Sequence, residues 1–451
     1  MKMNRNHTLT DGPLLPAIFR LALPAVLSFL LQGTYNFVDT YFVGYLGAES
    51  LAGISTGGFI LWMIFGLANL VSVGVAAKVA RRIGEGDRAE AECTAVRGIW
   101  YGLGTSIVLA VPFYFLLPIL FGFMHTPPDV TAQGLAYITP LIIGLPTIFL
   151  SFVMTGIFNA SGDTRTPFLL MLLTLSLSAL LDPLFIFGLG PLPAFGVAGA
   201  AWATIIARVL WIVLALRKLH RPDCAIHLQV RRKIAVSWTD YLSIVRIGLP
   251  KAFTGVLFSG IYMALTRVTA EFGTPNIAAL RIGHIFEGLS FFTATGFSIA
   301  ASTLVGQNLG ARQPQRAMRA AWMVGGIVFA YTGLVGLAFR LFADNLAGVF
   351  STDESVIIAG ASYLMILAWS QPFMGIEIVM EGGFSGAGNT LPPMLIQVPL
   401  TLLRYPVAVA LAFGTTLGVE GVWWAISGSS LFKGILMTFW FSRGRWRHTK
   451  V

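Results

Sequence analysis

The sequence predicts an all-α polytopic membrane protein with twelve transmembrane helices, arranged as two parallel-repeat six-helix bundles. The 451 residues are 56% hydrophobic and only 11% charged, whereas soluble globular domains carry about 25% charged residues. Apolar segments long enough to cross a bilayer, which takes about 20 residues, recur along the whole chain. The second half of the chain also repeats the first half at a constant offset.

The apolar segments define the expected spans, with boundaries accurate to a few residues. They lie at about 17–45, 52–77, 98–120, 133–156, 167–188, 197–216, 247–270, 277–305, 320–342, 357–381, 393–414 and 420–441. The N-terminal stretch has no signal-peptide cleavage pattern, and the first apolar segment is too long for a signal sequence, so we expect it to remain as a span. Cys93 and Cys224 stand alone, and we expect neither a disulfide framework nor a metal site.

The position of the basic residues predicts the orientation in the membrane. The net charge is +10, and in the first half Lys and Arg cluster before the first span and in the loops after the second, fourth and sixth. The alternate loops YLGAES, FGFMHTPPDV and GLGPLPAFG contain none. By the positive-inside rule we expect both termini to be cytoplasmic. We expect the protein to lie in the cell inner membrane. The basic excess thus reflects topology, and we expect contact with the lipid bilayer and no nucleic acid partner.

The internal repeat sets the expected domain organisation. RLALP at 20–24 matches RIGLP at 246–250, and VMTGIFNASGDTRTP at 153–167 matches VMEGGFSGAGNTLPP at 379–393, both 226 residues apart. Six spans per half is an even number, so both halves begin on the same side and the repeats are parallel. We expect an N-lobe at 1–222, a basic cytoplasmic linker at 223–245 and a C-lobe at 246–451, and alternating access by rocking of the lobes.

Acidic residues inside the first half predict the functional site. Gln32, Tyr35, Asn36 and Asp39 fall on one helical face, and an acid at the bilayer centre costs about 2.5–3.5 kcal/mol, so it is expected to face a cavity or a partner.

Two further polar stripes accompany this face. One comprises Thr174, Ser178 and Asp182, and the other Thr147, Ser151, Thr155 and Asn159. Together they predict a wet pocket in which Asp39 and Asp182 lie at similar depth. Such a pair can hold a proton, or a Na⁺ through its oxygens, as in the coupling site of a secondary transporter. The alternative is that each acid is satisfied by a hydroxyl or an amide.

The second half differs, because Leu265 stands where the repeat would place an acid equivalent to Asp39. Its acids are Glu287, Glu377 and Glu381. Glu377 and Glu381, four residues apart on one face, either form part of the wall of a cation-attracting cavity or brace the bundle by pairing with Arg404 or Arg281. The apolar side chains Met154, Met171, Phe258 and Met374 either line a large cleft or pack helices together. Pro24 either bends the first helix or simply begins it.

Several segments resemble the multidrug and toxic compound extrusion (MATE) family of cation-coupled exporters. They are LPAVLSFLLQGTYNFVDTYFVGYLG with the following LAGIS, the two glycine-rich turns of the repeat, and AASTLVGQNLGA at 301–312. The resemblance implies two six-helix lobes around a central cleft, with H⁺ or Na⁺ entering as drug leaves. Asp39 matches that family's first-helix acid.

The archaeal-type and DNA-damage-inducible branch of the family offers further matches. Its second acid matches Asp182, lining positions match Gln32 and Tyr137, and a bending proline matches Pro24. Ser178 and Thr155 replace lining asparagines of that branch, and Thr204 is an approximate match to a lining threonine. These departures leave the choice between H⁺ and Na⁺ open.

We therefore predict a monomeric antiporter, not an enzyme, that exports small amphiphilic compounds, cationic ones foremost, and needs no cofactor. An intramembrane aspartyl protease is disfavoured because its GxGD-type motif is absent from the predicted helices. The similar SGDT at 161–164 lies in a turn, and Asp182 lies in LLDPLF. The nearer alternative is a lipid-linked oligosaccharide flippase of the same superfamily. It would need a strongly cationic cavity for pyrophosphate, whereas the polar stripes of the first half are acidic or neutral.

Overall fold

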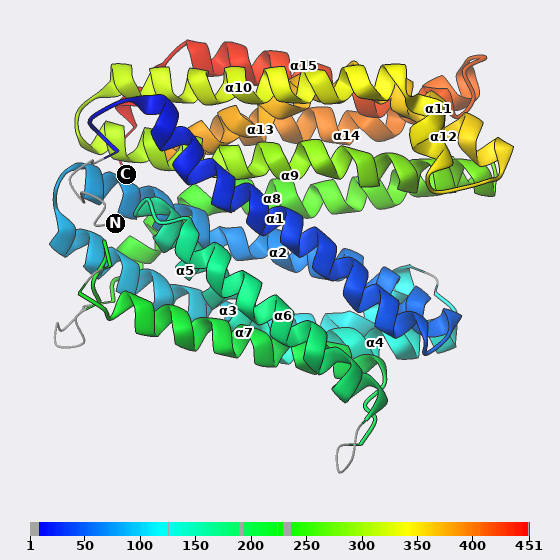
Figure 1. Cartoon of the computed structure of the whole chain (residues 1–451), viewed down its shortest axis with the longest axis horizontal. Coiled ribbons are helices and arrows are strands. Elements are labelled where there is room, and N and C mark those ends of the chain that lie inside the picture. The colour runs from blue at the N-terminus through cyan, green and yellow to red at the C-terminus, as the bar shows by residue number, and fades with distance from the viewer. Residues whose placement is uncertain (1–8, 125, 189–192, 223, 229–235, 450) are drawn as a thin grey trace. The chain divides into compact units, whose positions relative to one another are not determined.

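A computed structural model describes residues 9–124, 126–188, 193–222, 224–228, 236–449 and 451, apart from the side chains of Tyr35, Asn36, Phe37, Asp39 and Phe123. In these residues every regular element is a helix (Figure 1). The first half contains α1 (Leu14–Gly44), α2 (Ala48–Gly84), α3 (Arg88–Phe123), α4 (Pro128–Ile143), α5 (Leu145–Ala160), α6 (Arg165–Phe187) and α7 (Val197–Leu219). The second contains α8 (Trp238–Ala270), α9 (Thr274–Gly310), α10 (Pro314–Leu341), α11 (Ala343–Gly348), α12 (Glu354–Leu367), α13 (Gln371–Gly386), α14 (Leu391–Gly414), α15 (Glu420–Ser442) and the short 3-10 helix η1 (Arg445–His448).

The helices reproduce the sequence repeat. Helix α2 begins at residue 48 and α9 at residue 274, and α6 begins at 165 and α14 at 391, so both pairs are 226 residues apart. Nine described helices are individually long and apolar enough to span a membrane, and two bent pairs qualify as broken spans. Helix α15 completes the twelve segments and is less apolar, since it carries Glu420, Lys433 and several serines and glycines. The predicted all-helical fold with two six-helix repeats is confirmed.

Two expected continuous spans are broken, which corrects the sequence prediction at 133–156 and 357–381. Helices α4 and α5 meet at Gly144 with a bend of 57°, and α12 and α13 meet with a bend of 55°. Pro146 and Pro372 stand in the first turn of the second helix of each pair. Proline lacks the N–H that would continue the preceding helix and crowds the preceding turn, so each span restarts at this point.

The chain forms two compact units, and their boundaries lie inside helices. Unit 1 comprises residues 1–26 and 256–451, and unit 2 comprises residues 27–255. Helix α1 therefore contributes its first part to unit 1 and its second part to unit 2, while α8 does the reverse. Helix α8 also begins at Trp238, inside the segment expected as a linker. The predicted lobes at 1–222 and 246–451 stay a prediction.

Glycines allow the first parts of α1 and α8 to approach their neighbours closely. In unit 2, a Cβ on Gly248 of α8 would clash with the carbonyl oxygen of Leu70 on α2, and one on Gly74 of α2 would clash with Ile244 of α8. In unit 1, a Cβ on Gly296 of α9 would lie 2.6 Å from the backbone nitrogen of Val26 on α1. The first helix of each repeat thus begins against the second helix of the other repeat.

Candidate transport site

The polar stripe on α6 is buried within unit 2. Thr174 is 5% exposed, Ser178 1% and Asp182 0%. The outer residues of the same helix are apolar and exposed, as Leu172, Leu173 and Leu180 show. Helix α6 therefore turns its hydroxyls and its acid toward protein, as the spacing predicts, and Asp182 is the most deeply buried member of the stripe.

The end of α6 that carries Asp182 is hydrogen-bonded to the segment that leads into α7. Beyond it the backbone N–H groups of Phe195 and Gly196 donate hydrogen bonds to the carbonyls of Phe185 and Ile186, at 3.0 and 3.1 Å. Gly199 lies so close to this turn that a Cβ there would be 2.8 Å from the Ile186 nitrogen. These contacts dock the start of α7 on the end of α6 and fix the acid in position.

The first-helix residues of the expected site are only partly described. Tyr35, Asn36 and Asp39 belong to α1 by their backbone, but their side chains lie outside the described residues. Gln32 is described and half-buried. The meeting of Asp39 with Asp182 in one cavity therefore stays a prediction.

Pro24 lies well inside α1, which begins at Leu14 and continues past the proline. The alternative that Pro24 begins the helix is therefore wrong. Pro24 lies two residues before the boundary between the two units, and a proline inside a helix removes one backbone hydrogen bond. This position is compatible with bending, which stays a prediction.

The remaining expected lining residues differ in their surroundings. Tyr137 on α4 is 6% exposed and packs in the apolar core of unit 2, next to Gly57. Thr147 and Ser151 on α5 donate to the backbone carbonyls of Gly144 and Ile148, three residues before each, which reduces their need for water. The other expected residues are half-buried: Thr155 and Asn159 on α5, Met171 on α6 and Thr204 on α7.

Arg208 is a basic residue inside unit 2 that does not belong to any of the predicted polar stripes. It lies on α7, one helical turn from Thr204, and its guanidinium carbon is 5.6 Å from the centre of the Phe65 ring. It is half-buried. The interior of the first half is thus not purely acidic or neutral, and a lone arginine in the apolar span 197–216 was the available signal.

Unit 1 contains a second buried polar cluster, around Glu377 on α13. The Gln397 side chain on α14 donates to a Glu377 carboxylate oxygen at 3.0 Å, and the Lys433 ammonium on α15 lies 4.0 Å from the same oxygen. All three side chains are buried, with exposed fractions of 6%, 6% and 3% for Glu377, Gln397 and Lys433. The acid is therefore paired with a lysine that the sequence analysis had not considered.

Arg404 on α14 is equally buried, at 3% exposed. Its guanidinium donates to the hydroxyls of Ser429 and Ser430 on α15, the latter at 2.9 Å. Its carbon also lies 5.8 and 5.5 Å from the ring centres of Phe258 and Tyr262 on α8. Among the described residues no carboxylate lies within ion-pair distance of Arg404.

The other acids of the second half lie near these two cations. Glu287 on α9 is half-buried and within electrostatic range of Arg404 and Lys433, and Glu381 on α13 is buried at 7% exposed. Arg281 is exposed, so it is not the brace for the buried glutamates. The single Lys in the span 420–441 and the Gln and Arg in 393–414 were the sequence signals for this cluster.

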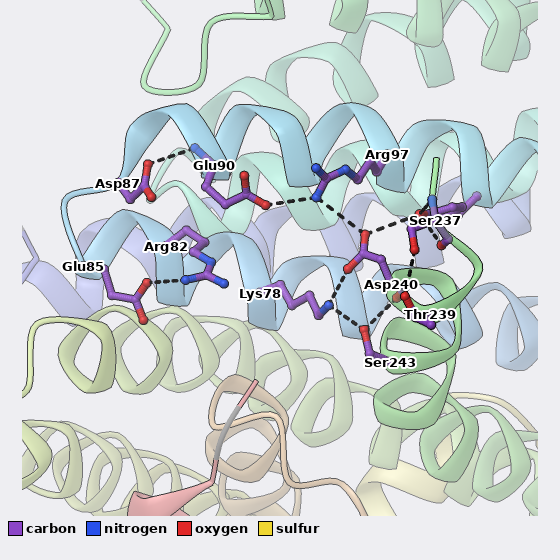
Figure 2. A network of polar contacts seen from close by, with 11 residues as sticks. Lys78, Arg82, Glu85, Asp87, Glu90, Arg97, Ser237, Thr239, Asp240 and Ser243 are labelled. Atoms are coloured by element: carbon purple, nitrogen blue, oxygen red, sulfur yellow. Dashed lines mark hydrogen bonds and ion pairs between the residues drawn. The ribbon is translucent and has the colours of Figure 1, made fainter. Parts of the chain in front are cut away.

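A polar network in unit 2 joins α2, α3 and the start of α8 (Figure 2). Asp240 on α8 accepts from the Lys78 ammonium at 2.7 Å, and its other oxygen lies 3.8 Å from the Arg97 guanidinium. The Tyr101 hydroxyl donates to the Ser237 carbonyl at 2.9 Å. This network anchors the first helix of the second repeat on the bundle of the first.

A model of the MatE family matches the chain twice, at residues 24–184 and 250–410. The two matches begin 226 residues apart, which is the offset of the repeat, and together they cover more than half of the chain. The chain belongs to the MatE family. MatE proteins are membrane transporters rather than enzymes, so the protein is a multi-pass membrane transporter.

Individual relatives cover nearly the whole chain. A probable multidrug resistance protein NorM from Thermotoga maritima is 27% identical, over 96% of this chain and 93% of that protein. An FAD transporter from Shewanella oneidensis is 26% identical, over 96% and 95%. A solved MOP superfamily transporter from Pyrococcus furiosus, whose binding pocket of reverse polarity is said to suggest a different function, is 25% identical, with a TM-score of 0.90 and complete coverage of both chains.

Proposed function

We propose that this MatE transporter exports small amphiphilic compounds, cationic ones foremost, in exchange for H⁺ or Na⁺. The observation that carries the proposal is Asp182, an acid with 0% exposure at the end of a buried polar stripe in a membrane helix. Acids inside a membrane are costly, usually face protein or a water-filled cavity, and commonly mark ion or proton pathways. The multidrug resistance protein of Thermotoga maritima supports export as the direction of transport.

In this scheme Asp39 completes the coupling site with Asp182, and Tyr35, Asn36, Ser178 and Thr204 supply further oxygens and an amide. Substrate contacts come from Gln32, Tyr137, Thr155, Asn159, Met171, Glu287, Glu377 and Glu381. Alternating access needs two mobile bodies, and Pro24, near a unit boundary, supplies a hinge. The protein acts as a monomer in the cell inner membrane with both termini cytoplasmic.

The coupling site is tested by reconstitution in vesicles with an imposed pH gradient and, separately, an imposed Na⁺ gradient. Efflux of a fluorescent aromatic cation should follow one gradient in the native protein and neither gradient in Asp39→Asn or Asp182→Asn. The matched control is Ser176→Ala, because Ser176 lies on α6 but is exposed and bonds only its own helix. Gradient-driven efflux in both acid variants would exclude this coupling site.

A second candidate is the flipping of lipid-linked oligosaccharides, which requires cations for a pyrophosphate. The buried Arg404 and Lys433 of unit 1 favour it, although Lys433 is already close to Glu377. The Shewanella FAD transporter also makes transport of anionic molecules a relevant alternative. A fluorescent lipid-pyrophosphate in the same vesicles separates the candidates, because only a flippase moves it between leaflets.

A further inference from the structure

Arg404 carries a buried positive charge that its surroundings satisfy only in part. Its Nε and Nη2 donate to Ser429 and Ser430, and the guanidinium also contacts the Tyr262 hydroxyl, but Nη1 is buried and has no hydrogen-bond partner among the described residues. A buried donor without a partner is costly, and the cost is larger for a charged group. Buried polar groups without a partner are uncommon in folded proteins, so this nitrogen calls for an explanation, and a bound ligand is one that completes its hydrogen bonds.

The nearby acids leave this nitrogen without a carboxylate. Glu377 is engaged by Gln397 and lies beside Lys433. Glu287 contributes a negative potential at Arg404, but no ion pair within 4.0 Å joins the two in the described structure. The Nη1 nitrogen is therefore available to an anion. Guanidinium groups bind carboxylate and phosphate particularly well.

The cover over Arg404 is aromatic. Phe258 and Tyr262, one turn apart on α8, place their ring centres 5.8 and 5.5 Å from the guanidinium carbon, and the two rings are 4.5 Å from each other. Both side chains are half-buried. A flat aromatic ligand that takes the place of one of these rings would replace the lost cation–π contact with its own.

We propose that Arg404 is an anion-recognition point for substrates in which a carboxylate or phosphate is attached to a flat aromatic system. The proposal rests on the proposed transport function and extends its substrate class beyond cations. Phe258 and Tyr262 cover the guanidinium when no ligand is bound, and the ligand's ring takes the place of one of them.

The test compares flavin mononucleotide with riboflavin, which share one ring system and differ by a phosphate. Binding to purified protein is followed by quenching of the flavin fluorescence. The native protein should bind the mononucleotide at least about tenfold more tightly, which corresponds to about 1.4 kcal/mol, and Arg404→Gln should remove this difference.

Naphthoate and its methyl ester form a second pair, which shows whether a carboxylate serves as well as a phosphate. Equal binding of the charged and neutral members of both pairs to the native protein would overturn the proposal.

Further variants keep the test independent of folding. Phe258→Ala uncovers the guanidinium and should bind the mononucleotide more tightly than the native protein; unchanged or weaker binding would contradict the role of the cover. Arg340→Gln removes an exposed arginine from the same unit and should keep the preference for phosphate. Efflux of the aromatic cation in the same vesicles reports the proposed transport function separately. If the cation is transported but the mononucleotide is not preferred, only the anion-recognition point fails.

Discussion

The Lys78 ammonium on α2 lies 2.7 Å from a carboxylate oxygen of Asp240 on α8, so the first repeat holds the first helix of the second. Their side chains are 15% and 20% exposed, which places the pair between a solvated ion pair and a fully buried one. The same lysine donates to Ser243, one turn further along α8. These polar contacts hold the first turns of α8 against α2 in unit 2.

Removing the Asp240 carboxylate should destabilise unit 2. We expect Asp240→Leu to cost about 1–3 kcal/mol, because it leaves the partly buried Lys78 charge with the Ser243 hydroxyl but without its carboxylate. Thermal unfolding in detergent measures the effect. Glu85→Gln is the matched control, since the side chains of its pair with Arg82 are 36% and 39% exposed and such pairs contribute less than about 1 kcal/mol. Equal losses in the two variants would show that the Lys78–Asp240 contact has no special role.

The α2–α8 crossing should depend on Gly248. Its Cβ would clash with the backbone carbonyl of Leu70, which cannot move aside as a flexible side chain can. Gly248→Ala should therefore destabilise the protein by about 1–3 kcal/mol, the usual cost of overpacking. Gly260→Ala on the same helix meets no atom within 4 Å and should be neutral or stabilising, as alanine favours helix. If both variants unfold at the same temperature, the close crossing is not present.

The sequence predicted the fold well, because repeat and hydropathy are both read along the chain. The 226-residue offset placed α6 and α14, and the spacing of Thr174, Ser178 and Asp182 identified a buried face. The breaks at Gly144 and near Ser370 were missed, since apolar windows run through them without interruption. A proline in such a window does not by itself distinguish a kink from a restart.

The second polar cluster was only half predictable. Glu377 and Glu381 were noticed as buried acids, but the partner of Glu377 lies two helices further on, at Lys433. Spacing within one helix cannot show which residue of another helix faces it. The alternative of bracing by Arg281 or Arg404 was chemically reasonable, yet Arg281 is exposed and Arg404 bonds serines instead.

Lys433 and Glu377 should stabilise unit 1 as a pair. Lys433→Met leaves a buried carboxylate without its cation and should cost about 3–5 kcal/mol, while adding Glu377→Gln should recover most of that loss. Unfolding of the two single variants and the double variant gives the coupling between the sites. Additive losses in this cycle would mean that the 4.0 Å separation is not an effective ion pair.

The three glutamates of the second half should affect substrate range or affinity more than ion coupling. Glu287, Glu377 and Glu381 belong to unit 1, whereas Asp182 and the predicted position of Asp39 belong to unit 2. Glu377 is also paired with a resident lysine and an amide, so it has less need of a transported cation. We expect Glu287→Gln, Glu377→Gln and Glu381→Gln to change the substrate concentration needed for half-maximal efflux. The change should differ between the aromatic cations, anions and zwitterions of a test panel. The ratio of ions moved to substrate moved, measured in vesicles under an imposed gradient, should stay at its native value in all three. A glutamate variant that uncouples transport as completely as Asp182→Asn would place a coupling group in unit 1, and the single-site scheme would have to be abandoned.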